Sequence, residues 1–564
     1  MSKYTVKAHG HNGEIDLTVD VQNEKIQDVT IDKHSETPAI FKQVFNQLKE
    51  DILTEQSFKV DAISGASDMT KSILDSADKT LKENGIDFPA PAPKPKEEKT
   101  FTTDVLVVGS GGAGLVAASR ALSLGKKVIL VEKNGYLGGA TILNGSNVVG
   151  TGSQVSAKIF GDASKADSAE RLAADIAHES KNTNYPELSQ LLADNIGQAI
   201  DFISDFADLN YQKAQTQTPE HSVERQIELP TSSSYEFITK VAKAFQAKGG
   251  TILTDCRVEG LLKHSDGTLA GLWCGGKHSE TKIYADKIIL AAGGYGAKVY
   301  NEGRGNGINY YGPLTSTGDS YTYAKELKLK THDLDWYKVY PHGLEVEPGI
   351  AKLTTYASKL ATDMGSIYVN QAGKRIVNES DVYTKLRDQV LKQDGQVAYL
   401  LMDQRTWDEF YKLLVLHDFS ETEIAEYLAN DGKKRPVLVE GSLQEVAQKA
   451  GIDVAGLEKT VADYEGYVAN NKDEEFGRAP EFLHSFEGDT YYLIEQRDRF
   501  ATTLGGYMAN QDMQLLDESD QPVANLYAAG EIVGGANGHD SMPSMMNSWS
   551  FASGFVAGTK ASQA

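Results

Sequence analysis

Residues 104–132 read DVLVVGSGGAGLVAASRALSLGKKVILVE, and this stretch decides the fold. Its apolar run 105–108 is typical of a buried parallel strand and leads directly into Gly109-x-Gly111-x-x-Gly114. Apolar residues at helical spacing follow, and then a second apolar run, 128–131, which ends in Glu132. A strand, a glycine turn, a helix, a strand and an acid in this order predict a βαβ unit that binds a dinucleotide.

Each glycine of the turn has its own physical task. Gly109 allows a tight turn, Gly111 lets the backbone approach a pyrophosphate, and Gly114 lets the helix pack closely on the strand. The helix N-terminus offers unpaired N–H groups and a positive dipole end to the phosphates. Glu132 stands where a carboxylate accepts hydrogen bonds from both ribose hydroxyls. The run GGAT at 138–141 favours FAD over NAD as the dinucleotide.

The composition is that of a soluble globular protein with several domains. The chain has 564 residues, of which 40% are hydrophobic and 24% charged, and its net charge of −23 argues against binding to nucleic acid or to an anionic membrane surface. Two cysteines, Cys256 and Cys274, cannot form a disulfide framework, and no Cys/His cluster suggests a metal site. No apolar run approaches the roughly 18 residues of a membrane span, and the start of the sequence lacks the apolar core of a signal peptide. A cytoplasmic location is expected.

Four segments are expected along the chain. Residues 1–88 hold three stretches of alternating apolar and polar residues, at 4–8, 15–21 and 26–32, and two helical patterns, at 38–53 and 67–84. Residues 89–99, rich in Pro and Lys, are expected to form a stiff linker. The dinucleotide-binding domain is assigned to 100–335 and 500–564, and the tyrosine-rich, highly charged segment 336–499 to an inserted capping domain.

Further patterns continue the dinucleotide-binding domain. Helices are expected at 187–208 and 235–248, and strands at 251–254, 258–262, 287–291 and 525–528, the last two leading into glycines. The predicted fold class is therefore α/β: a Rossmann-like domain with an inserted α+β capping domain, preceded by a small α+β domain.

Three blocks of the sequence together resemble one family. They are residues 109–132, the AAGGY of 291–295 with the TGD of 317–319, and the YAAGE of 527–531. They are similar to the FAD-binding domain of the fumarate reductase and succinate dehydrogenase flavoproteins, above all to soluble bacterial reductases of the urocanate, acrylate and vinylphenol type. The resemblance covers about residues 100–564 and implies that FAD is bound by Gly109, Gly111, Gly112, Ala113, Gly114, Glu132, Lys133, Gly138, Gly139, Ala140, Thr141, Val258, Ala292, Gly293, Asp319, Gly530 and Glu531.

The N-terminal segment resembles the small FMN-binding domain that is often fused to those reductases. In that family a Ser or Thr in the pattern Asp-x-x-Ser-Gly-Ala-Thr/Ser carries FMN through a phosphoester bond. The pattern is met by residues 61–67, which implies FMN attached covalently at Ser67. The family usually has hydroxyl residues two and three positions after the acceptor, and Met69 replaces the first of them here. From the residues alone, Ser67 also suits the N-cap of the helix that follows, and this alternative stays open.

The arginines and histidines with which this family binds a dicarboxylate are missing. By local alignment their positions fall on Tyr340, on residues 358–362, on Tyr383, on Thr502 and on Ser541, although the block 367–379 matches the family well. Tyr383 takes the place of the arginine that protonates the substrate carbon. Without these charges the burial of two carboxylates is poorly compensated, so fumarate is rejected as the substrate.

The residues that remain predict a different substrate pocket. Its expected lining of tyrosine and methionine suits a flat molecule that is neutral, phenolic or enone-like. We expect Tyr383 to donate the proton and Tyr340 to hydrogen-bond the substrate, although Tyr383 could also only fill space. Lys385 and Arg387 are interpreted as surface charges. The other expected lining residues are Met542, Met545 and Met546, and the substrate contacts are Ser541, Met545 and Thr502.

The function predicted from the sequence is the reduction of a carbon–carbon double bond. Hydride is expected from FAD, a proton from a tyrosine, and electrons through FMN from NADH, reduced flavin or a partner reductase. Three alternatives stay open: a fumarate or other enoate reductase, a flavin dehydrogenase similar to the ketosteroid dehydrogenases, and an electron-transfer flavoprotein that serves a protein partner.

Overall fold

The computed structural model describes residues 2–304, 307–347, 350–416 and 419–563. A small N-terminal unit consists of the antiparallel strands β1 (Ser2–His9), β2 (Glu14–Gln22) and β3 (Lys25–His34) with the helices α1 (Pro38–Glu55) and α2 (Ser67–Glu83). Alternate residues of the strands, such as Leu17 and Val19, are buried against Leu48 of α1 and Ile73 of α2. All five elements predicted for this segment are present, with ends shifted by up to two residues.

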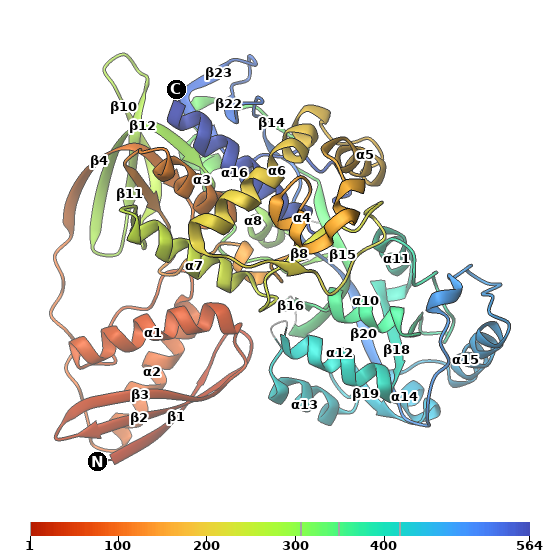
Figure 1. Ribbon diagram of the computed structural model, residues 1–564. Coiled ribbons are helices and arrows are strands. Elements are labelled where there is room, and N and C mark those ends of the chain that lie inside the picture. The colour runs from red at the N-terminus through yellow and green to blue at the C-terminus, as the bar shows by residue number, and fades with distance from the viewer. Residues whose placement is uncertain (1, 305–306, 348–349, 417–418, 564) are drawn as a thin grey trace.

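A mainly parallel sheet forms the centre of the molecule (Figure 1). Its order is β10 (Arg257–Lys263), β11 (Leu269–Gly275), β12 (Ser279–Leu290), β4 (Glu97–Val108), β5 (Val128–Val131) and β9 (Thr251–Leu253). The strand β23 (Pro522–Ala528) pairs in parallel with β12, so the last part of the chain returns to this sheet. Residues 86–96 form no helix or strand, and β4 begins at Glu97.

Glycine contacts hold the helices close to this sheet. The helix α3 (Gly112–Ser123) starts directly after the turn at Gly109, and a Cβ on Gly114 would collide with the carbonyl oxygen of Gly109. The C-terminal helix α16 (Met545–Gln563) packs on α3, with Gly554 facing Ala113. The helices α6 (Pro186–Ala207) and α7 (Ser234–Ala247) complete the layer, and the predicted α/β class is confirmed.

A second, seven-stranded sheet forms the part of the molecule that we call the cap. Its main order is β16 (Ile350–Leu353), β15 (Tyr337–Glu347), β20 (Tyr491–Thr503), β18 (Val397–Asp403) and β17 (Ile367–Val369). The short strands β13 (Asn309–Tyr310) and β19 (Leu438–Gly441) also pair with β20. Its helices are α10 (Thr355–Asp363), α11 (Tyr383–Val390), α12 (Gln404–Leu416), α13 (Glu421–Asn430), α14 (Leu443–Ala450) and α15 (Val454–Ala469).

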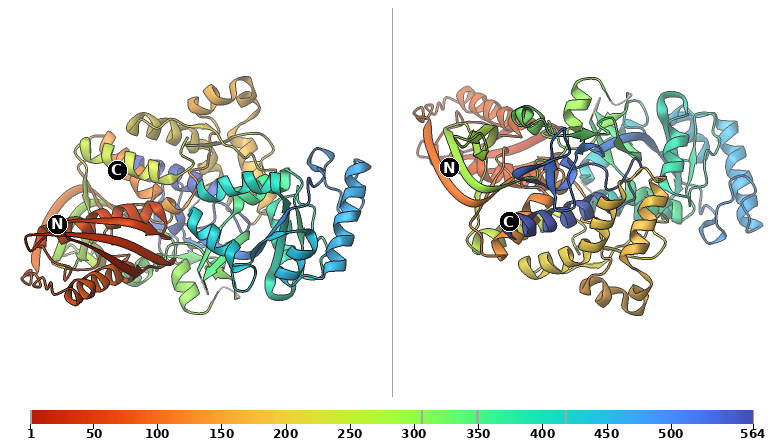
Figure 2. Two further views of the ribbon diagram at one scale, coloured as in Figure 1. Left: turned by 90° about the horizontal axis from the view of Figure 1, so that it is seen from below. Right: turned by 90° about the horizontal axis from the view of Figure 1, so that it is seen from above.

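The three units contact one another through polar residues at defined points. Figure 2 shows the N-terminal unit at one end of the molecule and α15 at the other. The loop before α2 touches the central unit, because Gly135 donates its N–H to the Ser64 carbonyl at 3.0 Å and Asp61 lies 2.6 Å from His278 Nε2. At the other side, Thr503 at the end of β20 donates both N–H and hydroxyl to Glu531, at 2.9 and 2.8 Å. No helix in the described parts of the chain is long and apolar enough to cross a membrane.

Candidate active site

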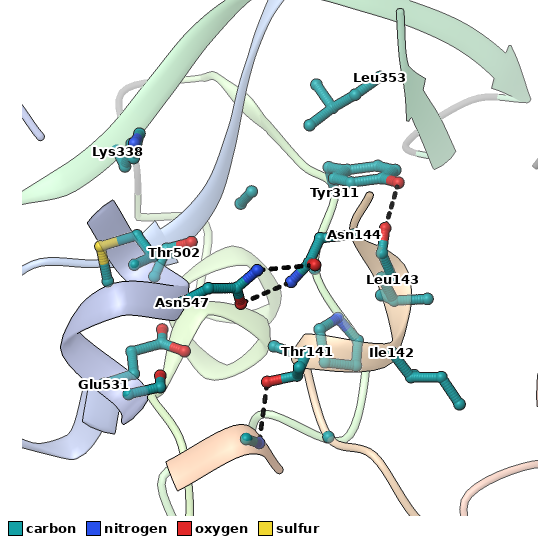
Figure 3. Close-up of a pocket in the computed structure, with 18 of the residues that line it drawn as sticks. Thr141, Ile142, Leu143, Asn144, Tyr311, Lys338, Leu353, Thr502, Glu531 and Asn547 are labelled. Carbon is teal, nitrogen blue, oxygen red and sulfur yellow. Dashed lines mark hydrogen bonds between the residues drawn. The ribbon is translucent and has the colours of Figure 1, made fainter. Parts of the chain in front are cut away.

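One cavity of about 330 Å³ connects the glycine turn of the central unit with the cap. At one end its walls come from the turn before α3, from residues 131–134 at the end of β5 and from residues 139–145. At the other end they come from β15, α10, α11 and residues 543–547. Figure 3 shows residues of both ends around the same space, with Thr141 and Asn144 from the central unit and Lys338 and Leu353 from the cap.

Most of the residues expected to hold FAD line this cavity. They are Gly109, Gly111, Gly112, Ala113, Glu132, Lys133, Gly139, Ala140, Thr141, Val258, Ala292, Gly293, Asp319 and Glu531. Gly114, Gly138 and Gly530 are absent from its described lining and allow close packing instead. A Cβ on Gly138 would lie 2.6 Å from Ile142, and one on Gly530, whose φ is 78°, would lie 2.7 Å from Ala113.

The dinucleotide end has the shape and the hydrogen-bonding groups that FAD requires. Around Gly111 no atom beyond its chain neighbours would lie within 3.7 Å of a Cβ, which leaves room for a pyrophosphate beside the N-terminus of α3. Glu132 is 6% exposed, and its carboxylate accepts from Ser110 N at 3.0 Å and from Asn134 N at 2.9 Å. These bonds hold the carboxylate toward the cavity, where it has lone pairs left for a ribose. The residues present therefore fit the group.

Side-chain hydrogen bonds fix the middle of the cavity. The amides of Asn144 and Asn547 donate to each other's oxygens, both at 2.9 Å, and so connect the segment 139–145 to the start of α16 (Figure 3). Thr141 Oγ1 accepts from Gly112 N at 3.0 Å, which joins the GGAT run to the start of α3. Neither bond could be predicted from the sequence. Asn144 and Asn547 are 403 positions apart, and Gly112 and Thr141 are 29 positions apart.

Two stacked tyrosines form the cap end of the cavity. The rings of Tyr340 and Tyr383 lie 5.7 Å apart with an angle of 24° between their planes. The Tyr383 hydroxyl donates to the carbonyl of Ser541 at 2.7 Å, and its backbone N–H donates to Glu220 at 2.9 Å at the start of α11. Burial raises the pKa of Tyr383 well above its usual value, so this phenol keeps its proton over the whole physiological pH range.

A lysine that the sequence analysis overlooked lies beside these tyrosines. Lys338 is 2% exposed and lines the cavity, with its Nζ 5.1 Å from the centre of the Tyr340 ring. Lys338 and Tyr340 are two residues apart on β15 and face the same side, and His342, which lies in an irregular part of the strand, lines the cavity as well. Burial lowers the pKa of His342 to about 3, which keeps its imidazole neutral. The period-two spacing was the signal that could have revealed Lys338.

The substrate contacts expected from the sequence are placed in two groups. Thr502 and Met546 line the cavity. Ser541, Met542 and Met545 are absent from the described lining, because their side chains, 0–2% exposed, are packed behind it. Ser541 nevertheless positions two residues that line the cavity. Its carbonyl accepts a hydrogen bond from the Tyr383 hydroxyl, and its hydroxyl accepts one from Lys338 Nζ at 3.2 Å.

The interpretation of Arg387 as a surface charge was wrong. Arg387 is 8% exposed, and its Nη1 lies 2.5 Å from a carboxylate oxygen of Asp540. Burial opposes the charge of Asp540, but hydrogen bonds from His539 and Arg387 outweigh it and lower the pKa of Asp540. Lys385, in contrast, is exposed and pairs with Asp381 at 2.6 Å. The helix α11 thus presents one charge to solvent and ties the other to the segment that carries Ser541.

A buried ionic network supports the wall behind the substrate end. Arg375 contacts Glu379 at 2.6 Å and Asp473 at 3.0 Å, and Arg478 contacts Glu379 at 3.3 Å. All four side chains have 0% exposure. Glu379 also lines the cavity. The block 367–379, which matches the family, therefore positions the cap wall through ion pairs.

The loop that carries the expected FMN site is exposed and adjoins the dinucleotide end. Ser67 is the first residue of α2, whose N-cap is Ala66 with no side-chain cap bond, so the N-cap interpretation of Ser67 was wrong. Ser67 is exposed, and within the described chain its hydroxyl makes no hydrogen bond. Ser64, three residues earlier, bonds Asp255 instead, and Thr70 closes the loop by accepting from Ile63 N at 3.1 Å. A free hydroxyl at a helix N-terminus fits a phosphoester.

Comparison with known proteins finds two families along the chain. The FAD binding domain family matches residues 104–545, and the FMN-binding domain family matches residues 10–82. A probable fumarate reductase of Shewanella frigidimarina is 29% identical over 78% of this chain and 71% of its own length. A urocanate reductase of Eggerthella lenta is 27% identical over 99% of this chain and 92% of its own length.

A solved structure extends this likeness to three dimensions. The open conformation of a flavocytochrome c3 fumarate reductase has a TM-score of 0.64 with 27% identity, and the match covers 83% of this chain and 79% of that one. The resemblance stated from the sequence is therefore confirmed. The chain belongs to the FAD binding domain family, as a flavin-dependent oxidoreductase that also contains an FMN-binding domain.

Proposed function

We propose that this chain reduces the carbon–carbon double bond of a small, flat, mainly apolar molecule of the phenolic or enone type. The observation that carries the proposal is the single cavity that runs from the FAD-binding turn to the stacked pair Tyr340 and Tyr383. The names of the relatives support the reaction class, because both relatives quoted above are named as reductases of unsaturated acids.

The residues of the cavity have distinct tasks in this proposal. Glu132 and the N-terminus of α3 would hold the ribose and the pyrophosphate of FAD, which when bound supplies hydride to the substrate. Tyr340 and Tyr383 offer an aromatic surface against which a flat substrate can stack. The cap, which we propose to comprise residues 336–499, closes the cavity and excludes water from the reacting atoms.

Tyr383 is the proposed proton donor. Addition of hydride to an alkene leaves negative charge on the neighbouring carbon, and a phenol is far more acidic than the C–H bond that forms. The hydroxyl is held in place by the Ser541 carbonyl at 2.7 Å, and its hydrogen can turn from that acceptor toward a substrate. The raised pKa of Tyr383 guarantees that the proton is present when the substrate arrives.

The charges at the substrate end argue against a dicarboxylate. The described lining at that end contains two basic side chains, Lys338 and Lys359. Lys359 is already paired with Asp363. Two carboxylates would therefore share one available cation, and burial of the second would be poorly compensated. This agrees with the absence of the family's substrate arginines from the sequence.

The N-terminal unit, proposed as residues 1–88, is assigned the electron-entry role, with residues 89–99 as its linker. The loop 61–67 contacts residues 134–136, and Asn134 lines the FAD end of the cavity. This contact supports electron transfer from FMN to FAD within one chain. NADH, reduced flavin and a partner reductase are the proposed donors, and a cytoplasmic location is proposed from the acidic composition.

The function is tested by anaerobic reoxidation of the reduced holoenzyme. The reduced protein is mixed separately with 4-vinylphenol, an enone, a cinnamate and fumarate, and flavin absorbance is followed with time. We expect fast reoxidation by at least one of the first three and slow reoxidation by fumarate. Fast reoxidation by fumarate, or none by any alkene, would contradict the proposal.

Replacement of Ser67 by alanine tests the assignment of FMN. We expect Ser67→Ala to remove covalently bound flavin completely, because no other free hydroxyl takes its place in the loop. Intact mass under denaturing conditions, compared with the wild type from the same host, gives the measurement. Ser64→Ala is the matched control and should keep the flavin mass, since the Ser64 hydroxyl bonds Asp255. Retention of flavin in Ser67→Ala would place the attachment elsewhere.

A further inference from the structure

The ammonium group of Lys338 is a charge that the protein itself leaves without a counter-ion. Its Nζ donates to the Met542 carbonyl at 2.7 Å and to the Ser541 hydroxyl at 3.2 Å, and both of these acceptors are neutral. An ammonium has three N–H donors, so one remains for a molecule in the cavity that Lys338 lines.

Other buried cations of this protein are paired with carboxylates. Lys352 lies 2.8 Å from Glu423, Arg225 lies 2.7 Å from Asp175, and Arg375 lies 2.6 Å from Glu379. For Lys338, no such contact within 4.0 Å occurs among the residues that the structure describes. A buried charge without a partner is costly, and a bound anion would remove that cost.

The surroundings of this ammonium define what can bind it. The Tyr340 ring lies 5.1 Å from Nζ, and Tyr383 stacks on Tyr340, so an aromatic surface lies next to a single cation. Lys359, at the same end of the cavity, is occupied by Asp363. This arrangement matches a flat apolar body that carries one negative oxygen group.

We propose that Lys338 binds the one oxyanion of the substrate, a carboxylate or a phenolate on a flat apolar body. The proposal rests on the C=C reductase function proposed above, because it names the substrate class of the same cavity. It also makes Lys338 a residue that determines specificity, since it accepts one negative charge and offers no partner for a second.

The charge state of Lys338 gives the proposal a measurable signature. Burial lowers the pKa of Lys338 to about 7, although the negative charges of Glu220 and Asp540 act to raise it. The nearby His221 is neutral, because burial lowers its pKa to about 4. Near neutral pH about half of the molecules would carry the charge in the absence of ligand. A ligand that is already ionised in solution, such as a carboxylate, favours the charged form, so its binding takes up protons, and its affinity falls as the pH rises above the pKa of Lys338.

The test measures binding to the oxidised holoenzyme and needs no turnover. Flavin absorbance is titrated with two pairs of ligands that have no reducible alkene: 3-phenylpropanoate with 3-phenylpropanamide, and 4-ethylphenol with ethylbenzene. For the wild type we expect 3-phenylpropanoate or 4-ethylphenol to bind about 10- to 100-fold more tightly than the other ligand of its pair, because a charge-assisted hydrogen bond contributes that much. For 3-phenylpropanoate, which is ionised at neutral pH, calorimetry in two buffers of different ionisation enthalpy should show the proton uptake. 4-Ethylphenol has to release its own proton to bind as a phenolate, so its binding should show no net uptake.

Two variants assign the effect to the residue. Lys338→Met keeps an unbranched side chain that is one atom shorter and has no charge. It should abolish the preference within either pair and the proton uptake with 3-phenylpropanoate. Lys359→Met, at the same end of the cavity but already paired with Asp363, should keep both. Preference within the first pair identifies a carboxylate, and preference within the second identifies a phenolate.

Equal binding within both pairs by the wild type would overturn the proposal, and so would a preference that persists in Lys338→Met. The wild-type titration decides this even where Lys338→Met does not fold. Because alkene reoxidation is measured separately, the enzyme can still prove to be a C=C reductase when this oxyanion site fails. Conversely, selective oxyanion binding without any alkene reduction would refute the proposed reaction and leave the binding site standing.

Discussion

Replacement of Tyr383 by phenylalanine is expected to lower kcat for alkene reduction by about 10²- to 10⁴-fold, the usual contribution of a positioned acid. Phenylalanine preserves the ring that stacks on Tyr340 at 5.7 Å and removes only the hydroxyl that donates to Ser541. Binding of substrate should therefore change little, so that KM stays similar while kcat falls. Stopped-flow absorbance of flavin reoxidation measures the effect on a protein whose FAD content is unchanged.

The matched control for this variant is Tyr337→Phe. Tyr337 lies on β15, the strand that carries Tyr340, but its hydroxyl points to Asp335 at 3.5 Å and it is absent from the described lining of the cavity. We expect its rate to remain within a factor of about two of the wild type, since surface changes usually have small effects. If Tyr383→Phe kept more than a tenth of the wild-type rate, another group would supply the proton.

The replacement Arg375→Met is expected to be the most destabilising of the changes considered. It removes a cation that contacts Glu379 at 2.6 Å and Asp473 at 3.0 Å, all without exposure to solvent. Loss of one partner from a buried ionic network typically costs about 3–5 kcal/mol, because the remaining carboxylates stay buried with less compensation. For a unit of the size of the cap this corresponds to a fall in the melting temperature on the order of 10 °C.

Differential scanning calorimetry of the holoenzyme measures this fall, and Arg405→Met provides the control. Arg405 pairs with Glu487 at 2.9 Å, but their side chains are 40% and 64% exposed. Exposed ion pairs contribute about 0–1 kcal/mol, so the control should melt close to the wild type. If Arg375→Met and Arg405→Met melted at the same temperature, the buried network would not be what holds the cap wall.

The glycine turn and its surroundings could be predicted from the sequence because each residue there acts locally. Gly109 and Gly114 must let a helix start against a strand, and in the structure a Cβ on either glycine would collide with backbone atoms. The alternation in residues 15–21 likewise specified a half-buried strand, since the period of a strand is two. The same local reasoning failed at Ser67, where the helix starts one residue earlier than a cap at that position requires.

The substrate end could be predicted only in part. Tyr340, Tyr383 and Thr502 were found because they replace family residues at aligned positions, and all three line the cavity. Lys338 could not be predicted in this way, because it lies outside the positions that align with the family's substrate residues. The burial of Arg387 could not be predicted from its neighbours in the sequence, because its partner Asp540 is 153 residues away along the chain.

The sequence alone thus determined the dinucleotide-binding turn and the α/β fold, because short-range periodicity and glycine stereochemistry specify them, whereas the FMN-binding domain was expected from its resemblance to a known family. Only the tertiary structure decided which charges line the cavity. The β15 strand brings Lys338 against Ser541, which is 203 residues away, and β20 carries Thr502 to the same cavity. The pKa and the availability of such a group depend on burial and on partners from distant segments, and neither is encoded in the residues next to it.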